Sequence, residues 1–119
     1  MDIGLAWAGI IDTQRAYDWD PTQLGGDTTL GAVAEGEEPQ ESTPEDRILG
    51  VEGPLWSETI EDFDQLATLA FPRAAALAEI GWTARDQRDW DGFRARFVTH
   101  PDRLAAMGLT SYDDPSLNE

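Results

Sequence analysis

The chain has 119 residues and a formal net charge of −16, from 24 acidic and 8 basic side chains. That length allows one domain at most. The acidic balance argues against binding to nucleic acid or to an anionic membrane surface, since both need basic patches. Because the chain has no cysteine, disulfides, thiolate metal ligands and thiol nucleophiles are excluded.

No apolar run approaches the roughly 20 residues that a membrane-spanning helix needs. The N-terminus also lacks the basic region that opens a secretory signal peptide. The sequence therefore predicts a chain that crosses no membrane, and it gives no indication of the cellular compartment.

The first 24 residues are predicted to form mainly a loop. Aspartates are scattered through them, and Pro21 breaks any regular element near their end. Within this segment, the stretch from Thr13 to Tyr17 has room for one or two helical turns. Asp18 and Asp20 are interpreted as turn formers ahead of Pro21, with a contribution to a binding site as the open alternative.

Residues 25–47 differ from the rest because glycine, proline and acidic residues dominate them, and only Arg47 opposes their charge. Such a segment buries too little apolar surface to offset the entropy of ordering it, so we expect a flexible acidic linker. Its acids lack the alternating spacing of a calcium-binding loop, which argues against a cation site.

Residues 48–56, Ile-Leu-Gly-Val-Glu-Gly-Pro-Leu-Trp, predict a short strand that ends at a Gly-Pro pair. One strand on its own leaves the backbone groups of both edges without partners. The sequence contains no neighbour for it, so the chain is interpreted as a piece of a larger fold. We expect the isolated chain to fold poorly or to associate.

Helices are expected after the strand. Ser57 or Thr59 offers the N-cap of the first helix, whose apolar side chains recur at helical spacing from Phe63 to Ala70. Pro72 ends this helix and suits the first position of the next.

Three further helices and a tail complete the chain. Trp82 and Trp90 lie among aliphatic neighbours, which favours places in the core, and the polar tail over 110–119 is expected to fray. The further helices are expected at 73–80 before Gly81, around 90–98 before His100-Pro101, and at 101–107 before Gly108.

The end of the predicted strand carries the residues best suited to a binding site. Trp56 offers a flat ring that can stack on a sugar, and Glu58 offers a carboxylate that can accept hydrogen bonds from hydroxyl groups. The alternative is that Trp56 lies in the core and Glu58 occupies the first turn of the following helix, where an acid favours the helix dipole. Trp7, between small residues, is open to the same two interpretations.

Little in the sequence suggests metal or proton-transfer chemistry. His100 stands alone before a proline, without a partner at ligand spacing. No phosphate-binding loop, Ser-His-Asp set or HExxH motif is present. The residues predict neither a metal site nor a cofactor.

Several motifs, in order, resemble the end of the catalytic barrel of glycoside hydrolase family 20, the β-N-acetylhexosaminidases. The resemblance covers nearly the whole chain except the acidic linker. Its motifs are Gly4–Gly9, Ala16–Pro21, Leu49-Gly50, Trp56-Ser57-Glu58, Phe71-Pro72-Arg73 and Ala78–Trp82, followed by Phe93, Arg96 and Leu104.

The resemblance implies an α/β fold, the C-terminal fragment of a (β/α)8 barrel, which is helix-rich in isolation. A closed barrel of this kind takes roughly 250 residues, so the chain holds only part of one. The implied parts are a loop segment after barrel strand seven (1–24), the acidic linker (25–47), the last strand and its helices (48–83), and the closing helices and tail (84–119).

The resemblance also implies a glycosidase that removes terminal N-acetylglucosamine or N-acetylgalactosamine, using the acetamido group of the substrate as nucleophile. Trp7 and Trp56 are implied to enclose the sugar of the −1 subsite, and Glu58 to bind its C4 and C6 hydroxyl groups. No residue here matches the acid/base glutamate of the family, so the chain alone is expected to be inactive. Its expected partners are N-acetylhexosamine-containing glycans and a complementing N-terminal part of the barrel.

Two functions outside hydrolysis stay open. One is a non-catalytic carbohydrate-binding module that uses Trp7, Trp19 and Trp56 as a stacking surface. The other is an acidic helical interaction module with no link to sugars.

Overall fold

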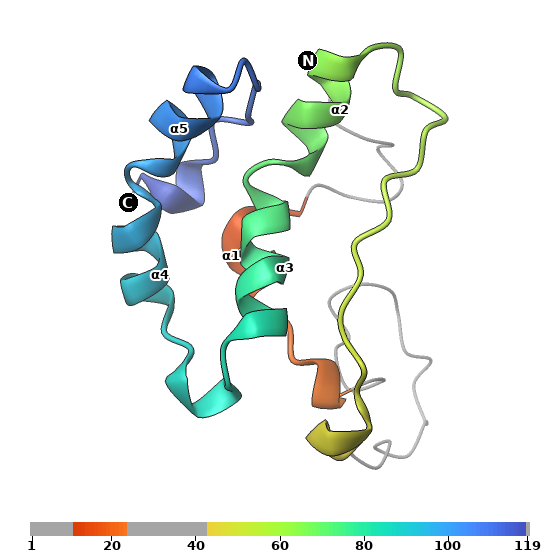
Figure 1. Cartoon of the computed structure of the whole chain (residues 1–119), viewed down its shortest axis with the longest axis vertical. Coiled ribbons are helices and arrows are strands. Elements are labelled where there is room, and N and C mark those ends of the chain that lie inside the picture. The colour runs from red at the N-terminus through yellow and green to blue at the C-terminus, as the bar shows by residue number, and fades with distance from the viewer. Residues whose placement is uncertain (1–10, 24–42, 119) are drawn as a thin grey trace.

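The computed structural model describes residues 11–23 and 43–118, and the regular elements of this part are all helical (Figure 1). Trp7 and most of the expected acidic linker lie outside it. The main helices are α1 (Thr13–Tyr17), α2 (Phe63–Ala70), α3 (Arg73–Trp82), α4 (Trp90–Phe97) and α5 (His100–Ala106). Short 3-10 turns lie at Pro21–Gln23, Glu45–Arg47, Arg85–Gln87 and Pro115–Leu117.

The strand predicted at 48–56 is not formed in the described part of the chain. Residues 48–60, here called the extended segment, run as an open chain beside α3 (Figure 1). No backbone hydrogen bond joins 49–56 to another described residue. The local preference for extended backbone is met, but a strand also requires a neighbour, and the described residues provide none.

The extended segment is held by close approach to α3. A Cβ at Gly53 would overlap the side chain of Leu77, and a Cβ at Gly81 would lie 3.2 Å from Cγ2 of Val51. Glycine at these two positions therefore lets the segment lie directly against the helix.

Helix boundaries follow their capping residues, with two corrections. The α2 helix begins after Asp62, whose carboxylate accepts a 2.8 Å hydrogen bond from the backbone N–H of Gln65. The prediction of Ser57 or Thr59 as N-cap was therefore wrong, because a competing acceptor lies next to the first helical residue. The α3 helix continues through Gly81 to Trp82, two residues beyond the expected end at Ile80.

The C-terminal helices lie close to where the sequence placed them. The α4 helix is capped by Asp89 and ends at Phe97, before His100-Pro101. The α5 helix is followed by Gly108 with a φ of 73°, a left-handed conformation that suits glycine at a helix end. The α1 helix confirms the short helical stretch at Thr13–Tyr17.

An aromatic core joins α1, α3 and α4. The ring of Tyr17 lies 4.9 Å from that of Phe93, which lies 5.6 Å from that of Phe97, and Ala76 of α3 packs against this cluster. Trp90 is half-buried at its edge. Trp82 is 92% exposed, so its predicted core position was wrong: in the last turn of α3, Ile80 is the buried side chain and Trp82 lies on the surface.

The tail does not fray; residues 110–118 form a C-terminal strap across the helices. The backbone N–H of Tyr112 donates to the carbonyl of Phe71 at 3.0 Å. Further along, Asp114 is only 2% exposed and accepts a 2.7 Å hydrogen bond from the backbone N–H of Thr13. The sequence suggested a free tail because these partners lie far away in the chain.

Two effects act on the carboxyl group of Asp114. Burial raises its pKa, but the hydrogen bonds from Thr13 and Ser116 outweigh burial, so the pKa lies below the ordinary 3.8. The folded state therefore favours the ionised form. Its contribution to stability is complete above the ordinary pKa and is lost as the pH falls through the folded pKa.

We expect a carboxyl NMR titration to give Asp114 a midpoint below 3.8. Thr13→Val removes one hydroxyl donor and should raise that midpoint, whereas Thr13→Ser, which keeps the hydroxyl, should leave it low. A midpoint at or above the ordinary value in the unmodified chain would contradict the geometry.

Hydrogen exchange should separate the extended segment from the helices. The amide of Val51 has no described acceptor and should exchange almost as fast as in an unfolded chain, while that of Ile80 in α3 should be protected. Equal protection at both amides would contradict this assignment. No protection at either would support the expectation that the isolated chain folds poorly.

Candidate functional site

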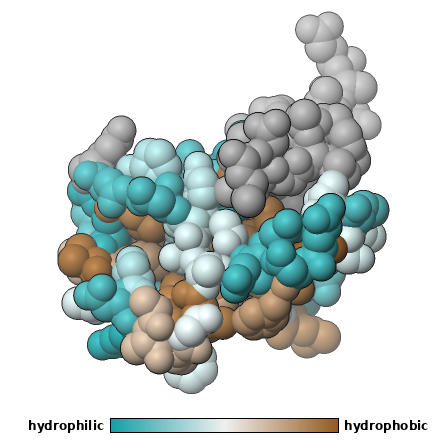
Figure 2. Space-filling model, turned by 90° about the horizontal axis from the view of Figure 1, so that it is seen from above, coloured by the Kyte–Doolittle hydropathy of each residue, from teal (hydrophilic) through white to brown (hydrophobic). Residues whose placement is uncertain are grey.

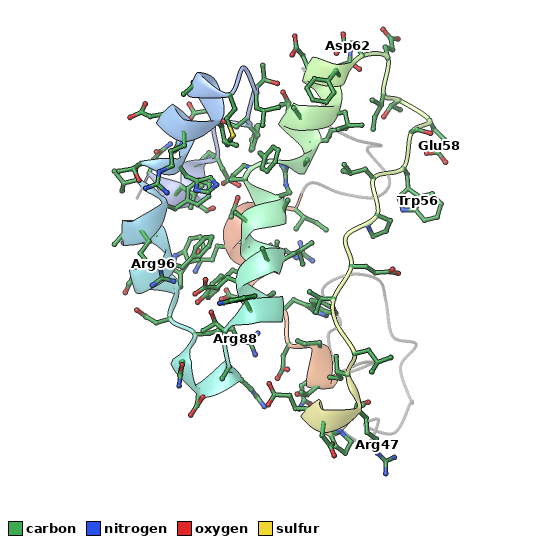
Figure 3. All side chains as sticks on the ribbon, in the orientation of Figure 1. Arg47, Trp56, Glu58, Asp62, Arg88 and Arg96 are labelled. Atoms are coloured by element: carbon green, nitrogen blue, oxygen red, sulfur yellow. The ribbon has the colours of Figure 1, made fainter. Side chains whose placement is uncertain are left out.

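Trp56 and Glu58 lie on the side of the extended segment that faces away from the helices. Figure 3 shows both side chains pointing outward from the segment. Val51 and Gly53 lie against α3, whereas Trp56 and Glu58 lie further along the segment, beyond this contact, and both are exposed.

The structure does not support the core and capping interpretations of these two residues. Trp56 is 74% exposed, so it is not part of the core. Glu58 lies before Asp62, the N-cap of α2, and so does not belong to the first turn of that helix. Both side chains are therefore available to a ligand, and the third predicted site residue, Trp7, lies outside the described residues.

The arrangement can bind a sugar more readily than it can cleave one. An exposed indole offers an apolar face, and a nearby carboxylate offers acceptors for hydroxyl groups. Within residues 11–23 and 43–118, no cluster of three or more histidine or acidic side chains could hold a metal ion. In the same part of the chain, no helix is long and apolar enough to cross a membrane.

Two hollows occur elsewhere on the described surface, and neither is lined by Trp56 or Glu58. One, of about 390 Å³, lies between α1, α3 and residues 52–55 of the extended segment, and Trp19 lines it. The other, of about 530 Å³, lies between α3, α4 and α5, with Trp82 and His100 among its lining residues. On the face seen in Figure 2, hydrophobic side chains reach the surface among hydrophilic ones.

The aspartates near Pro21 support the turn. Asp20 accepts hydrogen bonds from the backbone N–H and hydroxyl of Thr22 and pairs with Arg85 at 2.9 Å. Burial raises the pKa of Asp20, but the hydrogen bonds from Thr22 and the nearby arginines outweigh it and leave the pKa low. Asp18 forms the C-cap of α1, and burial, then the charge of Asp12, raise its pKa.

Arg73 is a structural residue whose role the sequence did not reveal. Its Nε donates to the carbonyl of Ile11, and one terminal nitrogen donates to the carbonyl of Leu69 at 3.1 Å. The guanidinium group also lies over the ring of Tyr112, 5.0 Å from its centre. The sequence feature that could have indicated this role is the position of Arg73, a charged residue directly after Phe71-Pro72 in an otherwise apolar stretch.

Comparison with known sequences points to one family. A family model described as "Glycosyl hydrolase family 20, catalytic domain" matches residues 2–85. The chain is 34% identical to a β-N-acetylhexosaminidase of Cellulomonas fimi, over 98% of this chain and 21% of that protein. It is 33% identical to a β-hexosaminidase of Akkermansia muciniphila, over 79% of this chain and 16% of that protein.

Solved structures agree with the sequence matches. The family 20 β-N-acetylhexosaminidase of Streptomyces coelicolor A3(2) is 38% identical with a TM-score of 0.72, over 95% of this chain and 20% of that one. The N-acetyl-β-hexosaminidase of Streptomyces plicatus, in complex with thio-NAglucal, is 40% identical with a TM-score of 0.71, over 94% of this chain and 19% of that one. The chain thus spans about a fifth of the length of these relatives.

Because Trp56 is exposed and Phe93 is buried, replacing each by alanine should change the free energy of unfolding by different amounts. Trp56→Ala should change the free energy of unfolding by no more than about 0.5 kcal/mol, as for other surface positions. Phe93→Ala should cost about 3–5 kcal/mol, because it empties part of the aromatic core. Urea unfolding followed by circular dichroism measures both free energies. A comparable loss of stability in the two variants would show that Trp56 belongs to the core.

Proposed function

The chain belongs to glycoside hydrolase family 20, and from that premise we propose that it supplies one wall of the sugar-binding site of a retaining β-N-acetylhexosaminidase. The observation that carries the proposal is the outward side of the extended segment, where Trp56 and Glu58 are uncovered. In this proposal Trp7 and Trp56 enclose the sugar of the −1 subsite, and Glu58 binds its C4 and C6 hydroxyl groups.

The substrate is a glycan that ends in N-acetylglucosamine or N-acetylgalactosamine. A mutant of the matched β-hexosaminidase of Streptomyces plicatus has been solved in complex with the product GlcNAc, which supports this class of sugar. The reaction is substrate-assisted: the acetamido oxygen of the sugar attacks its own anomeric carbon, and a general acid protonates the leaving oxygen.

The 119 residues supply binding and no acid/base group in this proposal. The acid/base glutamate and the side chains that hold the acetamido group come from a complementing N-terminal part of the barrel. General acid catalysis contributes typically 100- to 10,000-fold to a rate, so the chain alone should be inactive. Residues 49–56 have no backbone hydrogen bond to another described residue, so their backbone offers that complementing part a place to add strands.

A hybrid enzyme tests the proposed roles. This chain would replace the matching fifth of the Streptomyces coelicolor enzyme, and hydrolysis of p-nitrophenyl N-acetyl-β-D-glucosaminide would be measured. Glu58→Gln should lower kcat/KM by about 10- to 100-fold, because hydrogen bonds to a charged group contribute about 1.5–3 kcal/mol. Trp56→Ala should cause a loss of similar size by removing the stacking face.

Trp82→Ala is the matched control, since it removes another exposed tryptophan, which lines the hollow between α3, α4 and α5 and is not part of the extended segment. It should leave kcat/KM unchanged, and thermal melting would show that each hybrid is folded. Full activity in both the Glu58 and Trp56 variants of a folded hybrid would refute the proposed sugar wall.

Binding without catalysis is the second candidate, and the exposed ring of Trp56 favours it. Titration of the isolated chain with N-acetylglucosamine, followed by tryptophan fluorescence, tests this function. Quenching that Trp56→Phe weakens would support it, whereas an unchanged spectrum up to millimolar sugar would exclude it.

A further inference from the structure

Another uncovered surface of the described part lies across α3 from the extended segment. It is the hollow of about 530 Å³ between α3, α4 and α5. In Figure 3, α3 lies between Arg96, which lines this hollow, and Trp56 on the extended segment. The hollow therefore belongs to a different face of the molecule from the proposed sugar wall.

The hollow is mainly apolar, and an exposed tryptophan lies at its edge. Trp82, the last residue of α3, lines the hollow and is 92% exposed. Covering an aromatic side chain removes about 150–250 Å² of surface from water, which is favourable. The rest of the apolar lining comes mostly from α3 and α4, through Ala74, Ala75, Ala78, Phe93 and Phe97. A partner with an apolar side chain would therefore fit against Trp82.

Of the two arginines in the hollow, one is paired within the chain and the other is not. The guanidinium of Arg96 binds the carboxylate of Glu79 at 2.5 Å, across the gap between α4 and α3. Arg103 makes no salt bridge with any described residue, although the chain has 24 acidic side chains and only 8 basic ones. A partner that carries a carboxylate beside its apolar side chain would match the hollow in charge as well.

The matched relatives indicate what covers this surface. Trp82 lies within residues 2–85, the part that matches the catalytic-domain family model, yet the chain spans only about a fifth of the length of its relatives. The extended segment likewise has no strand partner among the described residues. Because both surfaces belong to α3 or lie against it, the remaining part of one catalytic domain can cover both.

We propose that the hollow between α3, α4 and α5 is a docking surface for the complementing N-terminal part of the barrel. That part covers Trp82 with an apolar side chain and places a carboxylate beside Arg103. The inference rests on the proposed function, which requires the complementing part. It adds a contact across α3 from the edge at which strands are proposed to pair, so that α3 is held from both sides.

Hydroxyl-radical footprinting of the hybrid enzyme described above measures whether Trp82 is covered. Oxidation rates in the folded hybrid are compared with those in urea, which removes differences in intrinsic reactivity. We expect Trp82 to be protected about tenfold, because a covered side chain reacts only when the structure opens locally. Met107 is 65% exposed and does not line the hollow, so it is the control and should stay almost unprotected. Equally weak protection of both residues would overturn the inference.

The same measurement on the isolated chain tests for other covers. Trp82 should react there as fast as in urea at every chain concentration, because the described residues leave it exposed. Protection at all concentrations would assign the cover to this chain itself. Protection that grows with concentration would assign it to a second copy, and either result would overturn the inference.

Charge reversal tests the carboxylate that is expected beside Arg103. Arg103→Glu should lower the melting temperature of the hybrid by several degrees, because two carboxylates would then face each other in the covered hollow. Arg103→Gln removes the charge without reversing it; it should give a smaller shift and serves if Arg103→Glu does not fold. Arg47→Glu makes the same reversal at an exposed arginine outside the hollow and should shift the melting temperature much less. Equal shifts at the two positions would overturn the inference.

Failure of this inference and failure of the proposed function give different results. If the sugar wall is right, N-acetylglucosamine should protect Trp56 of the hybrid from oxidation and leave Trp82 unchanged. Protection of Trp82 without any effect of the sugar on Trp56 would support docking and contradict the sugar wall. The opposite pattern would support the sugar wall and overturn docking at the hollow.

Discussion

The structure depends on a helix that is packed on more than one side. The α3 helix presents Ala76 to the aromatic core around Tyr17 and Phe93, and its Leu77 and Gly81 lie against the extended segment. Small side chains make both approaches possible, since a larger residue at Gly81 would push Val51 away. A helix that is apolar on several sides is stable only when it is covered on several sides. The sequence Arg73–Trp82 therefore specifies a helix that is covered on more than one side, with Ala76 and Ile80 as its buried residues.

This double packing holds the extended segment in place although no described residue pairs with it as a strand. Val51 and Gly53 contact α3, and Trp56 and Glu58 lie beyond this contact and stay exposed. Leu49, which is fully exposed, and the unpaired backbone of 49–56 lie on the same segment. The segment that carries the proposed sugar wall is thus also the segment to which the proposed barrel neighbours would pair.

Local signals in the sequence predicted most of the helices, and the family followed from motifs. Gly108 and His100-Pro101 ended their helices close to where they were expected, because capping depends on residues within one turn. The motifs around Trp56 and Phe71-Pro72-Arg73 gave a family that the comparisons confirm.

The errors share a different cause. The strand at 48–56 required a partner, the fraying tail ignored Thr13 at a distance of 101 positions, and Trp82 was placed by its neighbours in sequence. The pairing of the strand, the order of the tail and the exposure of Trp82 all depend on residues more than one helical turn away in the sequence. Pairing and burial are decided by contacts that sequence periodicity does not describe.

The same long-range contacts join α1 to the C-terminal strap. Asp114 can act on α1 only because the strap is itself bonded to Phe71 and Arg73, so the α2–α3 junction carries the strap as well as the core. A carboxylate that accepts four hydrogen bonds has one arrangement in which all of them are satisfied, and burial makes every alternative costly. The strap therefore holds the start of α1 in a single arrangement, although the two segments are far apart in the sequence.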